Sequence, residues 1–188
     1  MTARRSIRAA AIPVAALCLA AFPPGFDRAA VAEETAACAA VEKAVRAIGE
    51  AERFHSRMLA RTPGRRRPME EEQFVLGDVV YASSPASGRW IKLPLTAEKR
   101  SALSTGVAGH PPRDCRDDGA AQTAGVATRV YAYSQDLPPR DGSPGSVAQG
   151  RLWVADSDGR PRRYEGQHGE VRVVLTFDYD AVAPPYGR

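Results

Sequence analysis

The hydrophobic pattern of the chain begins with a helical period. One apolar stripe recurs at intervals of three, four and three residues, and it is formed by Cys38, Val41, Val45 and Ile48. Charged residues occupy the positions between them, as on an amphipathic helix. Thr35 is a suitable N-cap and Gly49 a suitable end. We therefore expect an amphipathic helix from about Thr35 to Gly49.

After residue 50 the period changes to two, which is typical of strands with one buried face. In the first such segment Phe54, Ser56, Met58 and Ala60 point one way and their neighbours point the other. Short connections between such segments favour antiparallel neighbours. A short helix from Thr96 to about residue 104 interrupts the series, and residues 106–118 and 136–146 are predicted loops. Further strands are predicted at 73–76, 79–81, 89–93, 128–134, 152–154, 162–165 and 171–179.

This order of elements predicts an α+β protein with about eight antiparallel strands and two helices. A large sheet needs its apolar face covered. The two helices and the long loops are the only elements available for that. We expect one strongly curved antiparallel sheet with the two helices covering its concave face.

The N-terminus has the features of an export signal. Three arginines within the first eight residues precede an uncharged, mostly apolar stretch at residues 9–22. This stretch is too short to span a bilayer of about 30 Å, and Ala30 and Ala32 fit an A-x-A cleavage site. We predict a signal peptide at 1–32 and a single domain at 33–188, located in the periplasm or, alternatively, secreted. An uncleaved anchor or a lipidated cysteine is a less favoured alternative.

Removal of that segment changes the charge of the protein. The whole chain has 26 Lys and Arg against 22 Asp and Glu, a net charge of +4. The segment 1–32 carries four arginines and one aspartate, so 22 basic and 21 acidic residues remain, a net charge of +1. This balance argues against nucleic-acid binding. The run of arginines at 65–67, followed by glutamates at 70–72, is typical of a solvated loop, with anionic lipid headgroups or an acidic partner as the alternative.

Two cysteines remain in the domain, Cys38 and Cys115. In an exported protein such a pair favours one disulfide. Free thiols are an alternative, and redox chemistry is disfavoured because C-x-x-C spacing is absent. We found no catalytic motif, no histidine pair at metal-ligand spacing and no cofactor motif, so we expect neither a catalytic site, nor a metal site, nor a cofactor.

Together with the order of elements, several stretches carry a resemblance to a known family. They are the cysteine-bearing helix running into residues 53–56, then 77–81 with 88–92, and finally 150–165 with 177–180. The chain resembles the LolA-like family, which includes periplasmic lipoprotein carriers and lipid binders of the LppX/LprG type. The resemblance implies an open half-barrel with the helices as its lid. It also implies binding of an acyl chain between sheet and lid, without catalysis.

Ligand pockets are concave and mostly apolar, and each buried methylene contributes about 0.8 kcal/mol. The resemblance thus implies a lipid or the acyl chain of a lipoprotein as the partner, with a periplasmic or membrane protein as a further candidate. The alternative is an interaction module whose interior is filled by its own side chains. The apolar residues expected to line a ligand cavity are Phe54, Met58, Phe74, Leu76, Trp90, Trp153, Val173, Leu175 and Phe177.

Overall fold

The computed structural model describes residues 26–83, 88–108, 110–139, 145–180 and 182–185. Within these residues the chain forms two helices and nine strands, all of the strands in one sheet. In chain order the elements are α1 (Phe26–Glu50), β1 (Arg53–Arg61), β2 (Met69–Leu76), β3 (Val79–Ser83), β4 (Trp90–Pro94), α2 (Ala97–Ala108), β5 (Arg113–Thr123), β6 (Val126–Leu137), β7 (Ser146–Ala155), β8 (Pro161–His168) and β9 (Val171–Asp178).

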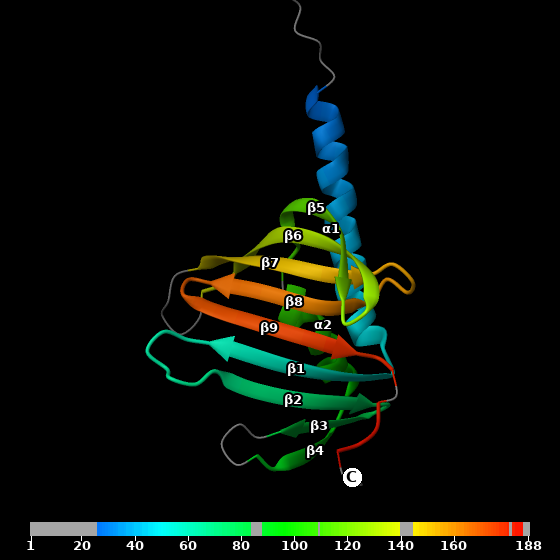
Figure 1. Ribbon diagram of the computed structural model, residues 1–188, viewed down its shortest axis with the longest axis vertical. Helices are drawn as coiled ribbons and strands as arrows, with labels where there is room; N and C mark the ends of the chain where they lie inside the picture. Colours follow the sequence, from blue (N-terminus) through cyan, green and yellow to red (C-terminus); the bar gives the residue numbers. More distant parts are fainter. Residues whose placement is uncertain (1–25, 84–87, 109, 140–144, 181, 186–188) are drawn as a thin grey trace, which may run out of the picture.

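The sheet has the strand order β4-β3-β2-β1-β9-β8-β7-β6-β5, and every neighbouring pair is antiparallel. The chain starts in the middle with β1 and forms a meander out to β4 (Figure 1). Helix α2 then leads to the opposite edge, and a second meander returns from β5 to β9, which pairs with β1. Strands β4 and β5 are the two edges and do not pair with each other, so the sheet stays open. The predicted α+β class and curved antiparallel sheet are confirmed, with nine strands where about eight were expected.

Both helices lie on the same side of the sheet, behind it in the view of Figure 1. We call the side that they cover the inner face and the opposite side the outer face. The first turns of α1 project beyond β5, and residues 30–36 are exposed. From Ala37 onward the apolar stripe of α1 is buried against the sheet, where Phe54, Val75 and Leu152 are fully buried. The core is therefore the layer between α1 and the inner face.

The first helix begins earlier than its sequence pattern predicts. It starts at Phe26, and Thr35 lies inside it instead of capping it. The Thr35 hydroxyl donates a hydrogen bond to the carbonyl of Val31, one turn upstream, at 2.8 Å. The predicted cleavage point after Ala32 falls within this helix, while residues 1–25 of the predicted signal lie outside the described residues. The signal peptide therefore stays a prediction.

Part of the predicted loop at 106–118 is wrong, because residues 113–118 belong to strand β5. This strand pairs with β6 through two register shifts, one between Arg113 and Arg116 and one between Asp117 and Gly119. Asp114 and Gly119 have φ angles of 53° and 97°, in the left-handed region. These bulges break the two-residue alternation by which a strand is recognised, so the sequence shows a loop-like pattern there.

Among the described helices, none is both long enough and apolar enough to span a membrane.

Candidate functional site on the inner face

The register of the strands assigns each predicted ligand residue to one face, because residues directly opposite on antiparallel strands share a face. Phe177 lies opposite Ser56, and Leu175 lies opposite Met58. Phe54 and Phe177 are buried in the core, with ring centroids 6.3 Å apart. Five of the nine predicted residues therefore lie together on the inner face: Phe54, Met58, Val173, Leu175 and Phe177.

The other four predicted residues lie on the outer face, away from the helices. Phe74 is opposite His55, and their rings stack at 4.2 Å between centroids. Trp90 packs against Phe74 at 5.3 Å, and Trp153 has the Arg163 guanidinium over its ring at 5.6 Å. Phe74, Leu76, Trp90 and Trp153 therefore do not line a space between sheet and helices.

These four residues were expected on the wrong face because alternation alone does not show which of two adjacent apolar residues points toward the core. Leu76 and Phe74 flank Val75, and it is Val75 that points inward and is fully buried. Trp153 likewise lies between Leu152 and Val154, both buried in the core. Where three consecutive residues are apolar, the pattern predicts a strand but not which residue faces the core.

The helices cover the inner face only in part. Met69 lies opposite Ala60, Ile91 opposite Ala82, and Leu93 opposite Val80, so all three side chains belong to the inner face. They are nevertheless 39%, 50% and 43% exposed. Met58 and Leu175 are half-buried. Apolar side chains of the inner face thus remain accessible beyond the contacts of α1 and α2.

Two tyrosine rings occupy space that glycines leave open on the inner face. A Cβ on Gly150 would lie 2.8 Å from Cζ of Tyr133, and a Cβ on Gly166 would overlap the hydroxyl oxygen of Tyr164. The Tyr133 hydroxyl has no hydrogen-bond partner within the described residues, and the same holds for Tyr179. Burial raises the pKa of both phenols. Both hydroxyls stay protonated at neutral pH, so each is a buried O–H donor without an acceptor among the described residues.

The Cys38–Cys115 disulfide fixes the first helix against this face. It joins α1 to β5 with the two Cα atoms 5.2 Å apart. Cys115 is buried in the core, and Cys38 packs against the core from the helix side. The predicted disulfide is confirmed.

Taken together, the inner face offers apolar surface and two buried O–H donors. Within the described part of the chain no three His, Cys, Asp or Glu side chains are arranged to hold a metal ion.

Comparisons with known proteins show a similar fold at low sequence identity. No protein-family model and no curated protein sequence matches the chain. The crystal structure of LprF from Mycobacterium bovis matches with a TM-score of 0.51 and 13% identity, covering 81% of this chain and 98% of that one. The lipoprotein LppX of Mycobacterium tuberculosis matches with a TM-score of 0.50 and 14% identity, covering 80% and 98%. The resemblance to LppX-type proteins is thus confirmed at the level of the fold: this chain has the LppX/LolA-like fold.

Proposed function

We propose that this protein is an exported, non-enzymatic binding protein that holds an acyl chain of a lipid or lipoprotein, or another apolar ligand, between its sheet and its helices. The observation that carries this proposal is the set of exposed apolar side chains on the inner face, Met69, Ile91 and Leu93. Apolar surface left accessible in this way is a common mark of a binding site. The shared fold with LppX supports the proposal, because the LolA-like resemblance implies acyl-chain binding in the same layer.

The two buried tyrosine hydroxyls extend the proposal to the polar end of the ligand. A buried hydroxyl without a partner is costly, because its interactions with water are lost and not replaced. An ester or amide carbonyl of an acylated ligand would accept a hydrogen bond from Tyr133 or Tyr179. The site would then hold the chain by apolar burial and its linkage by these donors.

The cellular location proposed is the periplasm, with secretion as the alternative. It rests on the signal peptide predicted at residues 1–32. The Cys38–Cys115 disulfide is consistent with it, because disulfides persist in oxidising compartments.

Native mass spectrometry of protein purified gently from the periplasm tests the proposal. We expect mass increments that correspond to bound lipid. Met58 and Leu76 provide a pair of variants, since both are half-buried apolar side chains and they lie on opposite faces of the sheet. Met58→Gln should remove most of the bound lipid, while Leu76→Gln should keep it. A clean apo mass for the wild-type protein, or equal loss in the two variants, would contradict the proposal.

The second candidate is an interaction module with a self-filled interior. The observation in its favour is the tight core beneath α1, where Val41, Ile48, Phe54 and Leu152 are at most 2% exposed. The clean apo mass described above, together with retention of a periplasmic protein by the purified chain, would favour this function instead.

A further inference from the structure

The outer face carries its polar side chains in ordered rows across the strands. One row contains only neutral polar and cationic residues. Ser134 of β6 is opposite Gln149 of β7, which is opposite Gln167 of β8. Gln167 is opposite Arg172 of β9, and Arg172 is opposite Arg61 of β1. We call these five residues the arginine row.

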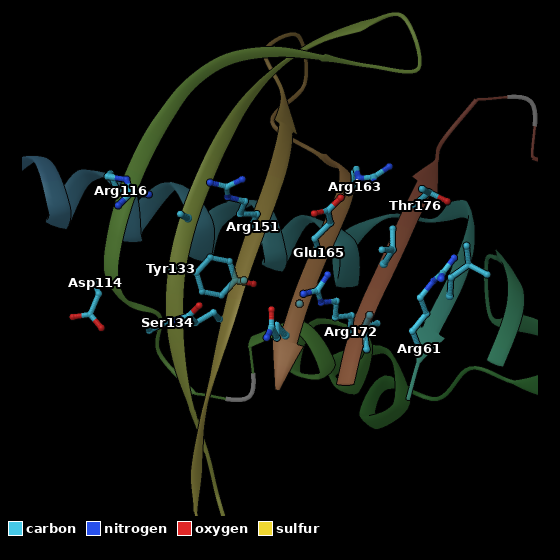
Figure 2. Close-up of a pocket in the computed structure, with 18 of the residues that line it drawn as sticks. Arg61, Asp114, Arg116, Tyr133, Ser134, Arg151, Arg163, Glu165, Arg172 and Thr176 are labelled. Atoms are coloured by element: carbon cyan, nitrogen blue, oxygen red, sulfur yellow. Dashed lines mark hydrogen bonds and ion pairs between the residues drawn. The ribbon is translucent and has the colours of Figure 1, made fainter. Parts of the chain in front are cut away.

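The arginine row lines a broad groove on the outer face, with a volume of about 1110 Å³ (Figure 2). Six arginines and two carboxylates line this groove. Beside the row, Leu59 and Val174 form an apolar strip of the floor, directly opposite each other on β1 and β9. The groove is therefore cationic, with a small apolar surface next to the arginine row.

Four of the six arginines have carboxylate partners. Arg57 pairs with Glu70, and Arg163 pairs with Glu165 at 2.5 Å. Arg116 and Arg151 share Asp118, at 2.7 and 3.3 Å. These four guanidinium groups are at least partly neutralised by the protein itself, so they are not the sites of strongest attraction for an anion.

Arg61 and Arg172 differ from the others. They are exposed and lie directly opposite each other on adjacent strands. Within the residues that the structure describes, neither has a carboxylate at ion-pair distance. Like charges in directly opposed positions destabilise a sheet, and an anion bound between the two groups would remove that repulsion. The neighbouring amide of Gln149 adds neutral N–H donors on the same row, and the amide of Gln167, which donates to the Gly169 carbonyl at 3.1 Å, has one further N–H.

We propose that Arg61 and Arg172, together with Gln149 and Gln167, form a binding site for a phosphate group on the outer face. A guanidinium is planar and matches the oxygens of phosphate with two parallel N–H donors. Two such groups suit a dianionic phosphate monoester better than a single carboxylate. Free phosphate and the phosphorylated headgroup of a lipid share this chemistry. The size of the groove and the Leu59–Val174 strip leave room for the rest of a larger ligand.

The four residues of this site lie on the opposite face of the sheet from the proposed acyl-chain site, although Tyr133 and Val173 of that site also line the groove. Isothermal titration calorimetry with inorganic phosphate, on the protein with its disulfide intact, is the first arm of the test. The second arm uses dihexanoyl phosphatidic acid, with dihexanoyl phosphatidylcholine as the control without a phosphate monoester. The titrations are also carried out on the Met58→Gln variant. Because this variant should have lost most acyl-chain binding, the binding that remains reports on the headgroup.

We expect Arg61→Gln and Arg172→Gln each to weaken phosphate binding by about tenfold, the scale of losing a hydrogen bond to a charged group. Arg46→Gln, a substitution of an exposed arginine on α1 outside the groove, should leave binding unchanged. If phosphatidic acid binds more tightly than inorganic phosphate in the Met58→Gln background, the ligand of the site is the phosphorylated headgroup of a lipid. If the two probes bind with equal affinity, the ligand is free phosphate.

Arg172→Glu is the second variant, since it places a carboxylate opposite Arg61. It should abolish phosphate binding while the thermal unfolding midpoint stays the same or rises, which separates loss of the site from loss of the fold. The proposal is overturned if neither phosphate probe binds. It is also overturned if Arg46→Gln weakens phosphate binding as much as Arg61→Gln and Arg172→Gln do. Tighter binding of an oligoglutamate peptide than of both phosphate probes also overturns it, in favour of an acidic protein partner.

Discussion

At the scale of single residues, the contact between Gly150 and Tyr133 shows how the inner face is packed. The Tyr133 ring is 4% exposed, and it occupies the place where a β-carbon at position 150 would be. Gly150→Ala should therefore force the buried ring to shift and should destabilise the protein by about 1–3 kcal/mol, the usual cost of overpacking. Urea unfolding followed by circular dichroism measures this change.

Tyr133→Leu provides the control for that substitution. It removes the ring that the new methyl group would meet, so Gly150→Ala should cost much less in the Tyr133→Leu background than in the wild type. Equal costs in the two backgrounds would show that the effect comes from the strand backbone and not from the contact with the ring.

At the scale of elements, the disulfide is the covalent link between α1 and the sheet. Cys38 and Cys115 are 77 residues apart in sequence. In the chain-entropy model a closed loop of this length contributes roughly 4–5 kcal/mol to stability. Cys115→Ser should lower the stability by an amount of that order, and α1 should lose protection before the strands do, because its first turns project beyond β5. Hydrogen exchange followed by mass spectrometry checks the order of opening.

Cys38→Ser is the matched variant, since it breaks the same bond from the helix side. The two variants should behave alike if the covalent link is what matters. Simultaneous loss of protection in α1 and in the central strands β1 and β9 would contradict the expected order.

The elements also show how far the sequence could predict this structure. The strand from Phe54 to Ala60 and the last strand, β9, follow clean alternation, and both lie where the pattern predicts them. The disulfide was predictable because only two cysteines remain after residue 32. Strand β5 could not be recognised, since its bulges at Asp114 and Gly119 break the period that identifies a strand.

The candidate site was only half predictable for a related reason. Alternation predicts that a strand has two faces, but in the runs around Phe74 and Trp153 both faces carry apolar residues. The choice of inner face depends on pairing with strands far away in sequence, such as β1 with β9. The arginine row could not be predicted from the sequence for the same reason. Arg61 and Arg172 are distant in the chain, and only the strand order brings them opposite each other.

At the scale of the whole molecule, the buried tyrosines couple global stability to alkaline pH. Burial raises the pKa of Tyr133, Tyr164 and Tyr179 in the folded protein, while in the unfolded chain these phenols titrate near pH 10. The unfolded state therefore loses its phenolic protons first as pH rises. Their contribution to stability is complete below pH 10 and is lost progressively above it.

We therefore expect the free energy of unfolding to be insensitive to these groups between pH 7 and about pH 9 and to fall above pH 10. Tyr133→Phe removes one of the three phenols, and its hydroxyl has no partner in the described part of the chain. Because no hydrogen bond within the protein is lost, this variant should be as stable as the wild type at pH 7 or slightly more stable. Its stability should also fall less steeply above pH 10. Urea unfolding at a series of pH values measures both effects. An identical alkaline slope for the variant and the wild type would mean that the Tyr133 hydroxyl titrates normally in the folded protein and is open to solvent.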